Sequence, residues 1–122
     1  MECSVCGAYI SELHHVVHRS AAPYMANVKL NHKYLCYNHH RYKDGPHMNR
    51  KIDIKYKKEL QEKLVKLFNT KKYYSVVEIA DKLEIKEKEA KQIVKTLTWY
   101  PAGGYKSIDI VKRCMGGMLY DD

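Results

Sequence analysis

Two pairs of adjacent histidines lie near the cysteines at the start of this chain, His14–His15 in "LHHVVHR" and His39–His40 in "LCYNHHRYK". All seven histidines and three of the four cysteines fall within the first 50 residues. Thiolates and neutral imidazoles are ligands that zinc and similar divalent cations prefer, and a neutral imidazole is also a base near pH 7. The first part of the chain is therefore predicted to carry metal-binding and acid–base chemistry.

Four of these residues have the spacing of a closed zinc site. Cys3 and Cys6 form a C-x2-C pair followed by Gly7, and "CYNH" places Cys36 and His39 at the same spacing. Two such half-sites can converge on one tetrahedral ion. We expect this structural Zn²⁺ to stabilise the fold, since about 50 residues alone can bury only a small core.

The remaining histidines are predicted to lie on short elements that separate their roles. "ELHHVV" and "LNHKYL" are typical of strands, and "NHHRYK" could open a helix. Adjacent residues of a strand point to opposite faces, so His14 and His15 must act differently. Likewise His40 can serve another purpose than its neighbour His39, which belongs to the zinc quartet.

The C-x2-C pair, the strand "HH", the following Asn31 and the motif "LCYNHHRYKDGPHMN" together resemble the HNH endonuclease family. The resemblance covers roughly residues 1 to 60 and is closest to small phage-type members. It implies a ββα-metal core with a supporting zinc knuckle, and hydrolysis of DNA that leaves a 5′-phosphate and a 3′-hydroxyl.

The resemblance also implies roles for single residues. His14 and His40 would bind the catalytic metal, His15 would be the general base, and Asn31 would orient that base. Many members have Asp at the position of His14 and Cys at that of His39. Because histidine is a softer ligand than aspartate, Ni²⁺ or Zn²⁺ would compete with the usual Mg²⁺ or Mn²⁺.

Four further residues near the histidines are candidates for contact with DNA. The basic side chains of Arg19, Arg41 and Lys43 flank the expected site and could hold the phosphate backbone. His47 follows the turn "DGP" and is a candidate for an additional phosphate or metal contact.

The second half of the chain is predicted to be helical. Residues 49–68 carry apolar side chains at helical spacing opposite a lysine-rich face. Residues 73–97 then indicate two short helices, the first with a capping box from Ser75 to Glu78. Their pattern resembles the helix-turn-helix of winged-helix proteins, and residues 99–107 could form a small wing, although Glu84 stands where glycine is common. We therefore expect an α+β protein with a nuclease domain over residues 1–68 and a helix-turn-helix-like module over 69–122.

Composition is consistent with a polyanionic partner. The net charge is +8 and the isoelectric point is about 9.3, as is typical of proteins that bind nucleic acid. The N-terminus lacks the pattern of a signal peptide and no apolar run has the length of a membrane span. The expected location is the cytoplasm of a bacterial host, with a phage gene as one origin, and no membrane partner is expected.

Three classes of function remain open at this point. The first is a metal-dependent HNH endonuclease in phage or mobile-element DNA processing, where double-strand cleavage by one site per chain would favour a homodimer. The second is a non-catalytic, zinc-stapled DNA-binding regulator. The third is an interaction protein whose helical half docks onto a larger phage or host assembly.

Overall fold

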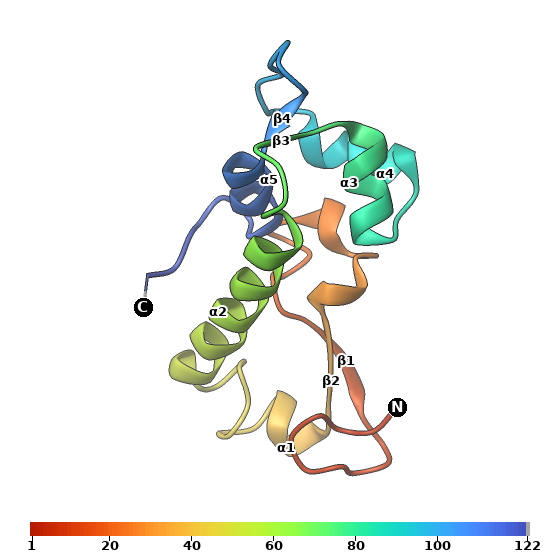
Figure 1. The fold of residues 1–122 in the computed structure, drawn as a ribbon. Coiled ribbons are helices and arrows are strands. Elements are labelled where there is room, and N and C mark those ends of the chain that lie inside the picture. The colour runs from red at the N-terminus through yellow and green to blue at the C-terminus, as the bar shows by residue number, and fades with distance from the viewer. Residues whose placement is uncertain (122) are drawn as a thin grey trace.

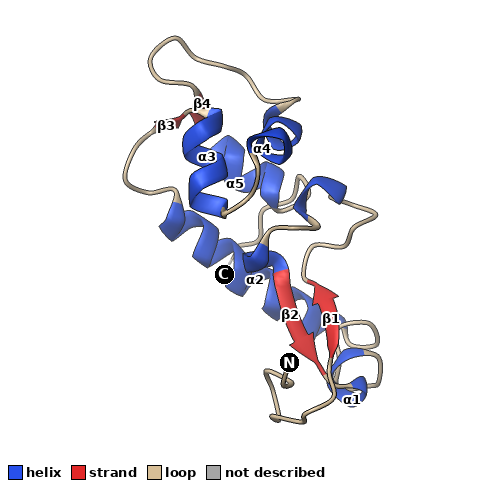
Figure 2. Ribbon diagram, turned by 90° about the vertical axis from the view of Figure 1, so that its right-hand side faces the viewer, coloured by secondary structure: helices blue, strands red, loops and turns tan. Residues whose placement is uncertain are grey.

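The computed structural model describes residues 1–121 and shows a mixed α+β protein, as the sequence predicts. Within this range it contains five α-helices and two antiparallel sheets of two strands each (Figure 1). The two sheets lie toward opposite ends of the molecule, with the long helix α2 (Arg50–Leu67) running between them (Figure 2). No helix of the described residues combines the length and the apolar character needed to cross a bilayer.

The first sheet and the helix that follows it form a small ββα unit. Strand β1 (Glu12–His15) pairs antiparallel with β2 (His32–Leu35), so that His14 faces Lys33 and His15 faces His32. Helix α1 (Tyr37–His40) follows directly and packs against both strands. The strands and the helix predicted from the sequence are thus present, although α1 is only one turn long.

The connection between β1 and β2 is fixed from inside by Asn31. It contains two short 3-10 turns, η1 (Pro23–Met25) and η2 (Lys29–Asn31). The Asn31 side chain is fully buried, accepts a hydrogen bond from Val17 N at 2.7 Å, and donates to the carbonyls of Val17 and Met25 at 3.1 and 3.3 Å. A buried amide with all these partners stabilises one conformation of the loop.

Helix α2 confirms the amphipathic pattern of residues 49–68. Asn49 caps its start by accepting hydrogen bonds from the backbone N–H groups of Lys51 and Ile52. Tyr56, Leu60 and Leu64 are buried on one face. This face packs toward the rest of the chain, while the opposite face carries exposed lysines.

The second half contains the two predicted short helices and a further one. Helix α3 (Val76–Leu83) begins with the predicted capping box and is followed by α4 (Glu87–Val94). Strands β3 (Tyr73–Tyr74) and β4 (Tyr105–Lys106) pair before α5 (Ser107–Cys114). Helix α5 is not among the elements expected from the sequence, yet it supplies Ile110, Val111 and a fully buried Cys114 to the core.

The two halves of the chain share one hydrophobic core. Buried residues before and after position 68 belong to the same continuous cluster. Polar contacts also join the halves: Tyr24 Oη donates to the Arg113 carbonyl at 2.7 Å, and Asn27 Nδ2 donates to Glu89 at 2.8 Å. The expected division after residue 68 therefore falls at the end of α2, within a molecule whose halves pack on each other.

Glu84 ends helix α3 in the left-handed conformation, with φ of 54° and ψ of 45°. This conformation costs an L-residue about 1 kcal/mol and glycine far less. We expect Glu84→Gly to raise the free energy of unfolding by about 0.5 kcal/mol, because the relief of strain exceeds the entropy that glycine gains in the unfolded chain. Chemical denaturation of the variant and the wild type measures this difference in the free energy of unfolding. Lys63→Gly, on the exposed middle of α2, should instead lower stability by about 1 kcal/mol, and a loss of stability in both variants would contradict the prediction.

Candidate metal centres

The predicted cysteine quartet converges in space. The ligand atoms of Cys3, Cys6, Cys36 and His39 all lie within 4.8 Å of one another, and we call these four residues the cysteine cluster. The sulfur atoms of Cys6 and Cys36 are 3.7 Å apart, and Cys3 Sγ is 3.8 Å from His39 Nδ1. A tetrahedral zinc ion with bonds of about 2.3 Å to sulfur would separate two sulfurs by about 3.8 Å. The cluster therefore fits a closed metal site.

The loop that presents Cys3 and Cys6 is held in shape by its own backbone. Gly7 has a φ of +75°, a conformation that favours glycine, and its N–H donates to the Cys3 carbonyl at 2.9 Å. Ser4 N donates to the Tyr34 carbonyl at 2.8 Å, which ties the loop to β2. Although burial raises the pKa of the Cys3 thiol, hydrogen bonds from the backbone, chiefly at Cys36, lower it to about 6. Cys3 is thus suited to the thiolate form that a metal requires.

The four cysteines should differ sharply in reactivity toward a thiol reagent. Cys114 is fully buried, and burial raises the pKa of its thiol to about 12, so we expect it to react only in unfolded protein. Once chelation removes the metal, the three thiols of the cysteine cluster should react with 5,5′-dithiobis(2-nitrobenzoic acid), and Cys114, in α5, only in denaturant. Rapid reaction of four thiols without denaturant, or of fewer than three after chelation, would contradict this assignment.

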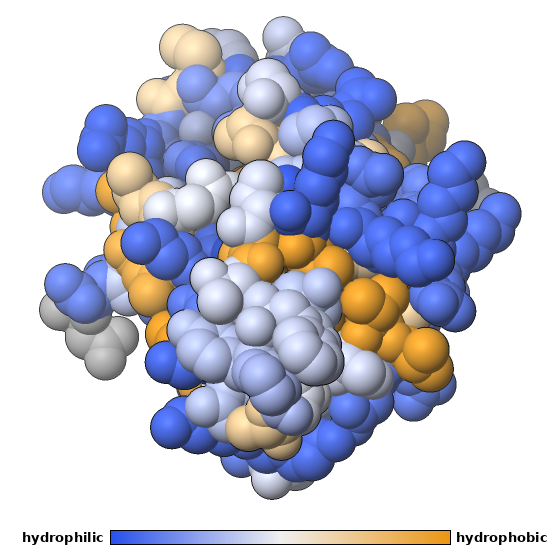
Figure 3. Space-filling view, turned by 90° about the horizontal axis from the view of Figure 1, so that it is seen from above, coloured by the Kyte–Doolittle hydropathy of each residue, from blue (hydrophilic) through white to orange (hydrophobic). Residues whose placement is uncertain are grey.

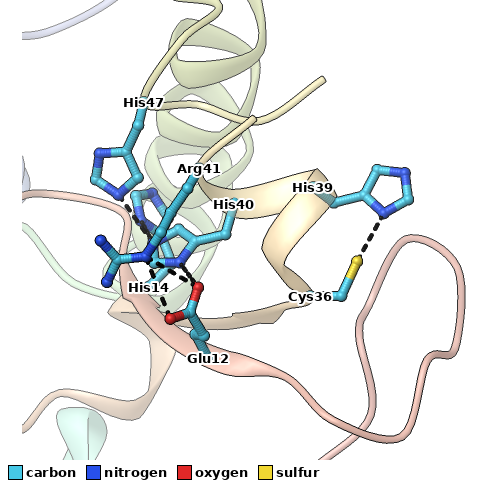
Figure 4. Close-up of polar contacts among 7 residues, drawn as sticks. All are labelled: Glu12, His14, Cys36, His39, His40, Arg41 and His47. Atoms are coloured by element: carbon cyan, nitrogen blue, oxygen red, sulfur yellow. Dashed lines mark hydrogen bonds and ion pairs between the residues drawn. The ribbon is translucent and has the colours of Figure 1, made fainter. Parts of the chain in front are cut away.

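A second cluster contains three histidines from three different segments. The ligand atoms of His14, His40 and His47 lie within 4.8 Å of one another, and we call these residues the histidine cluster. His14 comes from β1, His40 from the end of α1 and His47 from the loop before α2 (Figure 4). His40 Nε2 lies 3.2 Å from His14 Nδ1 and 2.8 Å from His47 Nε2. The two histidines expected to bind a catalytic metal, His14 and His40, are thus brought together, and His47 joins them.

The buried members of this cluster are suited to metal binding. His14 and His40 are only 2% and 4% exposed. Burial, reinforced by the nearby His40, lowers the pKa of His14 to about 3, so its imidazole is neutral at pH 7. Nε2 of His14 is buried and has no hydrogen-bond partner among the described residues. Three adjacent imidazoles, one of them with an unpartnered buried nitrogen, fit a divalent cation of intermediate softness.

Glu12 orients His40 from the side away from the cluster. Its carboxylate accepts a hydrogen bond from His40 Nδ1 at 2.9 Å and from Arg41 Nε at 3.1 and 3.2 Å (Figure 4). Hydrogen bonds from His40 and Arg41 lower the pKa of Glu12. Because Nδ1 of His40 donates to this carboxylate, its Nε2 keeps a lone pair that points into the cluster. Sequence reasoning missed Glu12, although it lies two residues before His14 and hence on the same strand face.

Gly45 allows the chain to bring His47 back to His40. A Cβ atom at position 45 would lie 2.5 Å from both the carbonyl carbon and the oxygen of His40. Such an approach excludes any side chain unless the backbone shifts. His47 N then donates to the His40 carbonyl at 3.4 Å. The turn "DGP" of the sequence therefore positions a third imidazole at the candidate metal site.

A hollow of about 210 Å³ lies over the histidine cluster and includes His15. It is lined by the following residues: Leu13, His14, His15, His18, Arg19, His40, Arg41 and His47. His15 Nε2 lies 3.1 Å from the Ala26 carbonyl. Since a carbonyl only accepts, Nε2 carries the proton and Nδ1 keeps a lone pair. Burial lowers the pKa of His15, so the neutral form that can accept a proton is favoured.

Of the other residues proposed from the sequence, the two arginines line this hollow, and Lys43 and Asn31 do not. Arg19 and Arg41 line it, but Arg41 is also paired with Glu12. Lys43 lies on the exposed segment after α1, outside the hollow. Asn31 is buried and so cannot touch a substrate. It contacts the backbone of Val17 and Met25, and it can orient His15 only indirectly, through the loop that contains Ala26.

No family model matches this chain, and neither a curated protein nor a solved structure matches it. The geometry and chemistry of the two clusters are therefore the basis for assigning a function.

Proposed function

We propose that this protein is a metal-dependent endonuclease of the HNH type that hydrolyses phosphodiester bonds in DNA. The observation that carries the proposal is the meeting of His14, His40 and His47 beside His15 in one hollow. A second cluster, rich in sulfur, lies apart from it. Two such sites suit one structural ion, which stabilises the fold, and one catalytic ion, which takes part in hydrolysis.

The cysteine cluster is proposed to hold the structural ion, Zn²⁺. Its four protein ligands complete a tetrahedral shell and leave no position for a substrate. The thiolates of three cysteines favour zinc over magnesium or manganese. The cysteine cluster joins the N-terminal loop to the start of α1. A zinc ion bound there would therefore fix the segment that carries His40.

The histidine cluster is proposed to hold the catalytic cation. Three protein ligands leave coordination positions open, as catalytic sites require. When bound, such a cation supplies positive charge against the phosphate oxygens and the leaving group. Three nitrogen ligands favour Mn²⁺, Ni²⁺ or Zn²⁺ over Mg²⁺, which prefers oxygen.

His15 is proposed to act as the general base. Its Nδ1 is free to accept a proton from the attacking water, because Nε2 is occupied by the Ala26 carbonyl. Asn31 positions this arrangement through the loop backbone and does not take part in proton transfer. Arg19, exposed at the rim of the hollow, would contact a phosphate.

Helices α3 and α4, with the strand pair β3–β4, are proposed to form a helix-turn-helix-like module that binds or positions the substrate. The support comes from the sequence pattern and from the packing of α3 against α4. Residues 69–122 contribute only +2 of the net charge of +8, so the charge of the chain does not by itself favour this module as the contact.

The first test is nicking of supercoiled plasmid by purified zinc-loaded protein in separate Mg²⁺, Mn²⁺ and Ni²⁺ buffers. We expect nicking to be fastest in Mn²⁺ or Ni²⁺ and to fall by at least about 100-fold in His40→Ala. Lys66→Ala, in the last turn of α2, is the control and should retain activity within a few-fold. Tight DNA binding without cleavage in any metal would instead favour a zinc-stapled regulator.

A further inference from the structure

A hairpin at the end of the molecule opposite the metal sites combines exposed aromatic rings with lysines. The bridge between Tyr100 and Gly104 closes it, and its returning strand β4 pairs with β3. Trp99 is 60% exposed, and the rings of Tyr73 and Tyr100 stand 5.5 Å apart. We call residues 99–106, together with 72–73, the aromatic hairpin.

The lysines of the aromatic hairpin are not neutralised. Lys72 Nζ lies 5.6 Å from the centre of the Tyr73 ring, and Lys106 Nζ lies 4.8 Å from that of Tyr100. Neither lysine forms an ion pair within residues 1–121, and Glu78, at the start of α3, is already paired with Lys71. Seen from this end, a patch of intermediate hydropathy is bordered by both strongly hydrophilic and hydrophobic side chains (Figure 3).

We propose that the aromatic hairpin binds single-stranded DNA, with unpaired bases stacked on Trp99 and phosphates held by Lys72 and Lys106. Aromatic rings interleaved with free cations are the recurring means of binding a single strand, because every base has a face that can stack and every nucleotide a negative charge. The inference rests on the proposed function only in taking DNA as the polyanion.

Helix α4 is a poorer candidate for this contact. It opens with Glu87 and Glu89, whose carboxylates repel phosphates at the position where a recognition helix would meet DNA. Glu89 is also held by Asn27 Nδ2, which directs this end of α4 toward the N-terminal half. Within the proposed helix-turn-helix-like module, the contact with nucleic acid is therefore assigned to the hairpin, and α4 supports the module by packing on α3.

Helix α2 sets the distance between the hairpin and the metal sites. Its first turn lies near the histidine cluster, where Asp53 is 3.8 Å from His18, and just beyond its end Phe68 packs on Tyr74 of β3 with ring centres 5.2 Å apart. Eighteen residues of α-helix span about 27 Å. This is the length of about eight stacked nucleotides, so DNA that reaches both sites must be at least that long.

Trp99 is the only tryptophan of the chain, so its fluorescence reports directly on the hairpin. The test is titration of zinc-loaded protein with a 20-nucleotide oligothymidine, without added catalytic metal. We expect quenching in the wild type, and in Lys72→Gln/Lys106→Gln a Kd raised about tenfold. The double variant Lys88→Gln/Lys95→Gln removes two exposed lysines from α4 and its end, and its Kd should change by less than about threefold. Anisotropy of a labelled oligonucleotide should show about tenfold weaker binding for Trp99→Ala.

Three results would overturn the inference: no binding of the oligonucleotide, binding without a change in Trp99 fluorescence, or equal weakening in the two double variants. Because no catalytic metal is added, failure here is distinct from failure of the nuclease proposal. If the protein cleaves DNA but Trp99 fluorescence does not respond to the oligonucleotide, only this inference is rejected. If Trp99 fluorescence is quenched but the protein cleaves no DNA in any metal, only the nuclease proposal is rejected.

Discussion

His15→Ala is expected to lower the rate of DNA cleavage about 1000-fold while leaving the fold and both metal sites intact. General-base catalysis is worth about 100- to 10,000-fold, and the structure offers His15 a fixed tautomer with Nδ1 free, since Nε2 donates to Ala26. Its side chain lies outside both the cysteine and the histidine cluster. The measurement is single-turnover cleavage in saturating Mn²⁺, with metal content and thermal unfolding compared with wild type.

His32→Ala is the matched control for this experiment. His32 pairs with His15 across the sheet, its ring centre is 5.2 Å from that of His15, and its Nε2 contacts the same Ala26 carbonyl at 2.6 Å. It does not line the hollow, so its loss should change the cleavage rate by only a few-fold. Equal losses in the two variants would indicate a structural effect of the Ala26 contacts, and unchanged cleavage in His15→Ala would rule out its role as the base.

Cys36→Ala is expected to weaken zinc binding severely and to unfold the N-terminal half. With one thiolate lost, water must complete the tetrahedral shell and zinc binds far more weakly. The binding energy of a structural zinc ion, about 10 kcal/mol, is comparable to the whole stability of a small domain. The region that would lose its cross-link includes β1 and α1, which have little core of their own. The measurements are zinc content by mass spectrometry and unfolding followed by circular dichroism.

Cys114→Ala separates loss of zinc from loss of a buried cysteine. Cys114 is fully buried in α5, far along the chain from the cysteine cluster. Its replacement should cost about 1 kcal/mol from the small cavity and leave one zinc per chain. Retention of zinc and of full stability by Cys36→Ala would show that the cysteine cluster does not hold the ion.

The ligands with regular spacing could be predicted from the sequence, and those that depend on the path of a loop could not. Cys3, Cys6, Cys36 and His39 follow a repeated x2 spacing, and they converge in the structure as expected. His47 was assigned only as a phosphate or metal contact, because its place beside His40 depends on the close approach at Gly45. Glu12 was missed because a carboxylate on a strand is usually solvated. Only the packing of α1 against β1 shows that its partner is His40.

In the fold too, elements with a local sequence signal could be predicted, and features that depend on distant parts of the chain could not. Helices α2 and α3 were predictable from local signals, namely apolar spacing and the capping box of Ser75 and Glu78. Helix α5 is as long as α3, but it starts directly after β4 without a side-chain cap, so no capping signal in the sequence marks its start. Asn31 was predicted to orient His15, but its bonds to the Val17 and Met25 backbone could not be foreseen, because they depend on the long loop between the strands.

The central claim is that two different ions bind at two separate places, and anomalous diffraction from crystals of zinc-loaded protein soaked in Mn²⁺ tests it most directly. We predict a zinc peak surrounded by the three sulfur atoms and His39, and a manganese peak bounded by His14, His40 and His47. Zinc at the cysteine cluster with no second metal peak among the three imidazoles, at Mn²⁺ concentrations that support cleavage, would contradict the account.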